Sequence, residues 1–139
     1  MPTFTLDAYL FFTGNCREAM EFYKEVFGGE LSVQTYGAAQ SDLPEEMKHM
    51  GDKVMHALLN GGLIRLMASD STRDKFEDSF ISLALGGTDE AKLREVFEKL
   101  SDGGKVTQPL KKESWGDVFG SLTDKFGVDW MVNISTEKA

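Results

Sequence analysis

The chain has 139 residues, of which 41% are hydrophobic and 27% charged, so one globular domain covering residues 1–139 is expected. Its formal net charge of -8 opposes binding to nucleic acid or to an anionic membrane surface, and no apolar stretch reaches the length of a membrane span. The single cysteine and the lack of a signal peptide predict a soluble protein of the reducing cytoplasm.

The first quarter of the chain predicts a strand, a helix and a second strand. Residues 4–12 form an aromatic-rich run typical of a strand. Asn15 is placed to cap a helix, with Glu18 completing a capping-box pattern. Residues 31–36 alternate as a strand does. Apolar side chains recur at helical spacing up to a stop at Gly28-Gly29, and they are Cys16, Ala19, Met20, Tyr23, Val26 and Phe27.

A hairpin is predicted around Asn60-Gly61-Gly62. The polar residues 38–53 before it suit a long loop with room for one short helix. Apolar runs at 54–59 and 63–68 flank the Asn-Gly pair, which favours tight turns because both residues tolerate positive φ. The charged residues 70–78 are expected to connect the two halves of the chain.

The second half repeats the order of the first, because Glu90-Ala91 and Gly103-Gly104 correspond to Glu18-Ala19 and Gly28-Gly29. A strand at 80–85 is followed by a helix that Thr88 is expected to cap, and strands follow near 105–110, 115–122 and 128–134. The helix presents one apolar face, made of Leu93, Val96, Phe97 and Leu100. Each half is therefore βαβββ, with module one at about 1–70 and module two at about 79–135. The fold class is α+β, and a cavity between two such sheets would be a natural ligand site.

Six segments resemble the vicinal oxygen chelate superfamily, which includes glyoxalase I, bleomycin-resistance proteins and extradiol dioxygenases. They are YLFFTGNC (9–16), EFY (21–23), KVMHA (53–57), GGKV (103–106), WGDVFG (115–120) and DKFGVDWMVN (124–133). Within the superfamily the chain is similar to the PhnB-like branch. The resemblance implies two tandem βαβββ modules whose sheets curl around a shared cleft. It also implies a homodimer, since members commonly pair.

The resemblance also indicates where metal ligands would lie, because metal-dependent members place His and Glu on the first and last strands of each module. Counting from the motifs puts these positions at Ala8, Met67, Phe80 and Met131. None of these side chains is a usual ligand of zinc or a hard cation, so no cofactor is expected. The alternative is a divalent metal held by other residues, which would make the protein a lyase or dioxygenase of the superfamily.

Strand periodicity predicts which side chains line the cleft. If Ala8 faces it, so do Leu6, Leu10 and Phe12, whereas Tyr9 and Phe11 pack against the helices. A two-residue hairpin loop would place His56 opposite Arg65 or Met67, on the same face. In the second half the inward set is Phe80, Ser82, Asp129, Met131 and Asn133.

Two polar side chains of this lining could carry chemistry. His56 can act as base, acid or ligand near pH 7, or can be a strand histidine held by hydrogen bonds. Arg65 needs either an anionic ligand or an internal carboxylate, for which Asp7, Asp117 and Asp129 are candidates. A metal site pairing His56 with His49 is a weaker alternative, because His49 is expected in the polar loop.

The remaining candidates have plainer explanations. Trp115, Phe119 and Trp130 could form an aromatic wall, although core packing is the commoner role for Trp130, and Trp115 is expected near the cleft mouth. Cys16 is expected to pack on the helix face rather than to react. Residues 124–127 are expected to form a tight turn.

The sequence therefore predicts a metal-free protein that binds a small, partly apolar molecule, with an acidic group as an option. Alternatives of another class are the metalloenzyme above and an interaction protein whose main role is dimerisation. The expected ligand-binding residues are Leu10, Phe12, His56, Arg65, Met67, Phe80, Trp115 and Met131.

Overall fold

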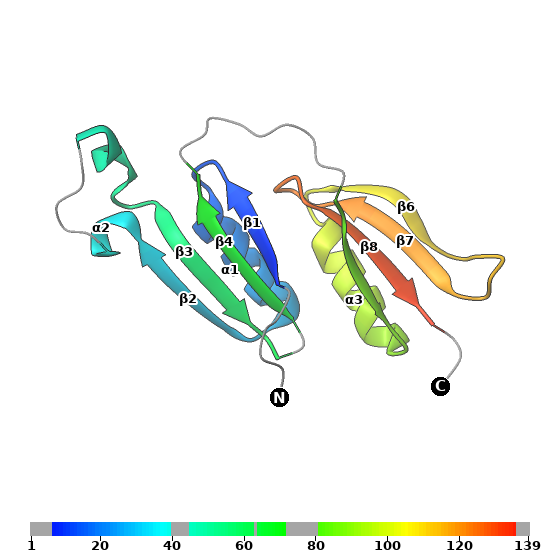
Figure 1. Cartoon of the computed structure of the whole chain (residues 1–139). Helices are drawn as coiled ribbons and strands as arrows, with labels where there is room; N and C mark the ends of the chain where they lie inside the picture. The colour runs from blue at the N-terminus through cyan, green and yellow to red at the C-terminus, as the bar shows by residue number, and fades with distance from the viewer. Residues whose placement is uncertain (1–6, 40–44, 63, 72–80, 136–139) are drawn as a thin grey trace. The chain divides into compact units, whose positions relative to one another are not determined.

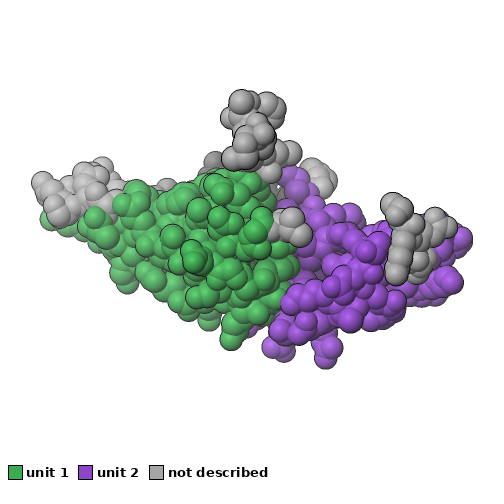
Figure 2. All heavy atoms as spheres, turned by 90° about the horizontal axis from the view of Figure 1, so that it is seen from below, with its two compact units in different colours: residues 1–76 green, residues 77–139 purple. Residues whose placement is uncertain are grey.

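The structure is a computed structural model that describes residues 7–39, 45–62, 64–71 and 81–135. The chain divides into two compact units, Met1–Phe76 and Glu77–Ala139. Figures 1 and 2 show the chain as a ribbon and as spheres, with the two units distinguished by colour in Figure 2. Each unit contains a four-stranded sheet and a long helix.

The two units have the same topology. The first contains β1 (Ala8–Phe12), α1 (Cys16–Phe27), β2 (Glu30–Thr35), α2 (Tyr36–Ala39), the 3-10 helix η1 (Glu45–Met50), β3 (Val54–Asn60) and β4 (Arg65–Asp70). The second contains β5 (Leu83–Gly87), α3 (Glu90–Ser101), β6 (Lys105–Lys112), β7 (Val118–Thr123) and β8 (Asp129–Ile134). The strand orders are β1-β4-β3-β2 and β5-β8-β7-β6, and the first pair of each is parallel. The predicted α+β class with tandem βαβββ units is confirmed.

The strand register divides the first sheet into two faces. Tyr9 and Leu58 both lie beside Met67, whereas Leu10 and Ala57 both lie beside Ala68. Side chains that are neighbours in register share a face. The helix-covered face of the first sheet therefore carries Ala8, Leu10, Phe12, Leu31, Val33, Ala57, Leu59, Leu66, Ala68 and Asp70. The open face of the first sheet carries Tyr9, Phe11, Glu30, Ser32, Gln34, His56, Leu58, Asn60, Arg65, Met67 and Ser69.

The core of the first unit lies between α1 and the helix-covered face (Figure 1). The predicted apolar stripe of α1 is confirmed, because all but one of its members are fully buried and Phe27 is partly buried. Burial of such side chains is the main term that stabilises the unit. The buried members are Cys16, Ala19, Met20, Tyr23 and Val26.

Helix α1 begins differently from the prediction. Asn15 occupies the N-cap position, but its side chain makes no capping hydrogen bond. The Oδ1 atom of Asp70 instead accepts from the backbone N–H groups of Gly14 and Cys16, both at 2.9 Å. The expected capping box is therefore wrong, and Asp70 is a buried end of β4 rather than part of a charged connector.

Helix α3 of the second unit is capped by its own sequence. The Asp89 side chain accepts from the backbone N–H of Lys92 at 3.1 Å, so the predicted cap at Thr88 is wrong by one residue. The predicted apolar face of this helix is confirmed, with Val96, Phe97 and Leu100 buried. No helix in the described ranges is long and apolar enough to cross a membrane.

The predicted hairpin forms, with a longer loop than a two-residue turn. Asn60 pairs with Arg65, and Gly61 N–H donates to the Ile64 carbonyl at 2.8 Å. Met67 consequently pairs with Leu58, so the expectation that His56 lies opposite Arg65 or Met67 is wrong. The parity was correct, because His56, Arg65 and Met67 do share the open face.

Candidate functional site

The open face of the first sheet exposes aromatic side chains in the part of the chain that the structure describes. Tyr9 is 38% exposed and Phe11 56% exposed, although both belong to a strand. The Tyr9 ring centroid lies 5.0 Å from that of Phe11 and 6.0 Å from that of His56. Contiguous exposed apolar surface of this kind marks binding sites more often than isolated apolar residues do.

Tyr36 begins α2, directly after the end of β2. Its hydroxyl donates to the backbone carbonyl of Asp70 at 3.0 Å, which ties the end of β2 to the end of β4. Burial raises the pKa of Tyr36, and the nearby Tyr9 and Asp70 raise this pKa further. Tyr36 is therefore a protonated hydrogen-bond donor at neutral pH.

Arg65 and Asp7 form an ion pair on the first unit. The Arg65 Nε atom lies 3.3 Å from Asp7 Oδ2, and the two side chains are 43% and 14% exposed. An internal carboxylate was the expected partner of Arg65, and Asp7 was one of the three candidates. The other two candidates have partners within the second unit, since Asp117 accepts from Asn133 and Asp129 accepts from Thr123.

The predicted orientation of β1 is wrong. Phe12 is buried and Leu10 lies beside the buried Ala68, so both belong to the helix-covered face, whereas Tyr9 and Phe11 belong to the open face. Counting from the helix motif gave the wrong parity because it assumed a fixed spacing between strand and helix. Ala8 is on the helix-covered face for the same reason and is not a position from which a ligand on the open face could be held.

The structure places the positions expected for metal ligands on different sides of their sheets. Met67 and Met131 lie on the uncovered sides of their sheets, and Phe80 lies outside the described residues. His49 is exposed on η1. Within the described residues, no three or more His, Cys, Asp or Glu side chains gather in a way that could hold a metal ion.

The uncovered side of the second sheet carries a mixed set of side chains. Met131 pairs with Ala84 and Ser121, and Asn133 pairs with Phe119. Trp115 is 61% exposed and meets Phe119 edge-on at 6.3 Å between ring centroids. Asp129, Met131 and Asn133 share one side of the sheet, as predicted, by alternation along β8.

Trp130 has the core role that its sequence position favoured. It is 2% exposed, and its Nε1–H donates to Asp124 Oδ2 at 2.9 Å. The other oxygen of Asp124 accepts from the backbone N–H groups of Phe126 and Val128. The predicted tight turn before β8 is therefore confirmed, and Gly127 adopts the positive φ of 90° that this turn needs.

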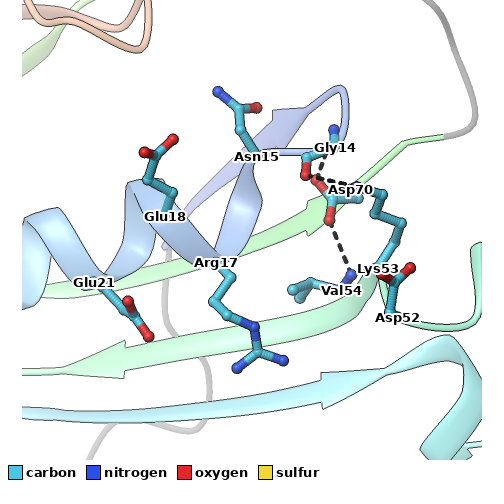
Figure 3. A pocket seen from close by; sticks show the side chains of 9 residues that line it. All are labelled: Gly14, Asn15, Arg17, Glu18, Glu21, Asp52, Lys53, Val54 and Asp70. Carbon is cyan, nitrogen blue, oxygen red and sulfur yellow. Dashed lines mark hydrogen bonds between the residues drawn. The ribbon is translucent and has the colours of Figure 1, made fainter.

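A pocket of about 370 Å³ lies at the start of α1 (Figure 3). Its lining mixes both charges, and Lys53 Nζ donates to the Gly14 carbonyl at 3.3 Å. Two backbone donors at this helix start, the N–H groups of Gly14 and Cys16, already donate to Asp70. The lining residues are Gly14, Asn15, Arg17, Glu18, Glu21, Asp52, Lys53, Val54 and Asp70.

Cys16 is a packing residue. Its side chain is buried, and burial together with the Asp70 carboxylate raises the pKa of the thiol to about 12, whereas Arg17 acts in the opposite direction. A thiol in this state is not a nucleophile near pH 7. The expectation of a packed helix-face cysteine is confirmed.

Sequence reasoning missed Tyr9 and Phe11 as open-face residues, and it gave no role to Tyr36. The signal that could have identified Tyr9 and Phe11 was the parallel pairing of β1 with β4, because Met67 was already expected on that face. Tyr36 was expected to end the strand at 31–36, but β2 ends at Thr35 and Tyr36 begins the short helix α2.

Two tandem βαβββ units, each with one helix-covered face, define a duplicated α+β protein of the glyoxalase type. Residues 5–132 match the sequence model of the Glyoxalase/Bleomycin resistance protein/Dioxygenase superfamily. The chain belongs to this superfamily.

Several relatives are similar over almost the whole chain. Protein YjdN of Escherichia coli is 30% identical, covering 93% of this chain and 94% of YjdN. The crystal structure of PA1353 from Pseudomonas aeruginosa is 37% identical with a TM-score of 0.82, covering 96% and 98% of the two chains. A Bacillus cereus structure described as a putative 3-demethylubiquinone-9 3-methyltransferase, PhnB protein, is 28% identical with a TM-score of 0.72, covering 95% and 100%. The similarity to the PhnB-like branch rests on this last structure.

Proposed function

We propose that the protein binds a small, partly apolar molecule on the open face of the first sheet, without a metal ion. The observation that carries the proposal is the exposed aromatic pair Tyr9 and Phe11 beside His56. Exposed rings in contact, with the Tyr9 and Phe11 planes tilted by 34°, offer an apolar surface to a ligand. Met67 and Leu58 extend this surface along the neighbouring strands.

The roles assigned here modify those expected from sequence. His56 and Met67 stay in the proposed site, Tyr9 and Phe11 replace Leu10 and Phe12, and Arg65 is left out of it because it pairs with Asp7. A contribution from Phe80, Trp115 and Met131, through a cleft shared by both modules, stays a prediction. The homodimer and the cytoplasmic location also stay predictions.

A fluorescent probe tests the location of the site. N-phenyl-1-naphthylamine is an uncharged aromatic dye whose emission rises when it leaves water. We expect the dye to bind the native chain and its dissociation constant to rise about tenfold in Tyr9→Ala and in Phe11→Ala, as for the loss of one ring contact. Val106→Ala removes an exposed apolar side chain of the second unit and should leave the affinity unchanged. Equal affinity in all four proteins would refute this site.

Native mass spectrometry with elemental analysis tests the absence of metal. The sample is purified without a chelator. We expect no transition metal in stoichiometric amount, and a retained small-molecule mass would identify the ligand. Zinc, nickel, manganese or iron near one per chain would overturn the metal-free proposal and favour a metal-dependent lyase or dioxygenase. The same spectrum reports whether the chain forms a homodimer.

A further inference from the structure

On the open face of the first sheet, charged and uncharged side chains lie in separate rows across the strands. Glu30, Asn60 and Arg65 lie in one row, and Asp7 reaches the same end through its ion pair with Arg65. Among the described strand residues of this face, the Asp, Glu, Lys and Arg side chains all lie in this row. Within this part of the chain, these charges are therefore confined to one end of the face.

In the described strands, the next rows hold no Asp, Glu, Lys or Arg side chain. The middle row contains Ser32, Leu58, Met67 and Tyr9, which follow one another in register across the sheet. Beyond it, Gln34 pairs with His56, and Phe11 pairs with Ser69. The surface thus changes from charged to apolar and then to uncharged hydrogen-bonding groups.

Arg65, the one Lys or Arg side chain among the described strand residues of this face, already has an acidic partner. Arg65 lies 3.3 Å from the Asp7 carboxylate, and Glu30 adds a second negative charge to the same row. An anionic ligand would have to compete with Asp7 for the guanidinium and would be repelled by Glu30. A cationic ligand would find the described carboxylates of this face only in the charged row, where Asp7 is already paired with Arg65.

We propose that the molecule bound on this face is an uncharged, flat aromatic compound with a hydrogen-bonding group. Its ring lies over Tyr9, Met67 and Leu58, and its polar group meets His56 and Gln34. This inference rests on the proposed function above, and it assigns the chemical class of the ligand. The option of an acidic ligand, left open by the sequence, is not retained.

Two dyes with one aromatic skeleton test the class of ligand. N-phenyl-1-naphthylamine is neutral, and 8-anilinonaphthalene-1-sulfonate carries one sulfonate. We expect the neutral dye to bind at least tenfold more tightly at physiological ionic strength. Because the neutral dye is also the more hydrophobic of the two, variants that alter the ion pair make the decisive comparison.

Asp7→Asn removes the partner of Arg65. It should raise the affinity for the sulfonate dye at least fivefold and change the affinity for the neutral dye less than twofold. Arg65→Met should lower the affinity for the sulfonate dye and leave the affinity for the neutral dye nearly unchanged. Glu25→Gln makes the same charge change as Asp7→Asn on an exposed position of α1 and should alter neither affinity. Circular dichroism verifies that each variant is folded.

The outcomes separate this inference from the proposed function. A sulfonate dye that binds the unmodified chain as tightly as the neutral dye would overturn the uncharged class, while binding at the open face would stand. Affinity ratios that do not respond to Asp7→Asn or to Arg65→Met would show that the ion pair does not set the preference. If neither dye bound the folded chain, this result would contradict the proposed function itself.

Discussion

Asp70 joins separate segments of the first unit through a single carboxylate. It is 1% exposed, and its oxygens accept from the backbone N–H groups of Gly14, Cys16 and Val54, all at 2.9 Å. Figure 3 shows two of these bonds as dashed lines, one from Gly14 to Asp70 and one from Val54 to Asp70. The start of α1 and the start of β3 are thereby fastened to the end of β4.

Asp70→Asn should therefore destabilise the first unit. An amide offers one oxygen in place of two and turns an N–H group toward a backbone N–H, so at least one buried donor loses its acceptor. We expect a loss of about 2–4 kcal/mol in the free energy of unfolding, measured with urea at pH 7. Asp89→Asn is the matched control, because Asn caps an exposed helix as well as Asp does. Equal losses in the two variants would contradict the role assigned to Asp70.

The Cys16 thiol should be unreactive in the native chain. At pH 9 an ordinary thiol with a pKa of 9.0 is half ionised, whereas a pKa of about 12 leaves almost none as thiolate. Folding stability that depends on the protonated thiol is complete below pH 9 and is lost as the pH rises toward 12. We expect the reaction with a disulfide reagent at pH 9 to be at least about 100-fold slower in the native than in the urea-unfolded chain. Similar rates would indicate an accessible thiol.

Single residues differed in how far the sequence revealed their roles. Cys16 and Trp130 could be predicted because helical spacing and an apolar strand placed them in the core. Asp70 could not, because its donors at residues 14, 16 and 54 are far from it in sequence and only the folded chain brings them together.

At the scale of elements, β1 shows the limit of periodicity. Alternation correctly separated Tyr9 and Phe11 from Leu10 and Phe12, but alternation alone does not say which set faces the helix. The side is decided by the register with β4, where Phe12 lies beside the buried Asp70 and Tyr9 beside Met67. A shift of one residue exchanges the two faces entirely.

Alanine substitutions at neighbouring residues of β1 test this orientation. Phe12→Ala empties a fully packed position and should cost about 3–5 kcal/mol of unfolding free energy. Phe11→Ala removes a ring that is 56% exposed and should cost less than about 1 kcal/mol. Both values come from urea unfolding followed by circular dichroism. The reverse order of costs would restore the orientation expected from sequence.

For the whole molecule, the duplication was the feature most visible in the sequence, because both halves carry a helix stripe and a glycine stop. The details diverged between the halves. The strand position that holds Asp70 at the end of β4 holds Ile134 at the end of β8, and Asp89 supplies the helix cap in the second unit instead. A repeated fold can thus be predicted from the sequence pattern, whereas the polar contacts that stabilise each copy can be identified only in the structure.

Each unit builds its core from its own helix and sheet, which suggests a last prediction about local opening. Asp70→Asn should accelerate amide hydrogen exchange in residues 8–70 and leave residues 83–134 nearly unchanged under native conditions. Asp124→Asn should do the opposite, because Asp124 holds Trp130 and the turn before β8. Mass spectrometry of peptides from the exchanged protein reads both regions in one sample. If either variant accelerated exchange equally in both regions, opening of one unit would require opening of the other, and the two cores would form one cooperative structure.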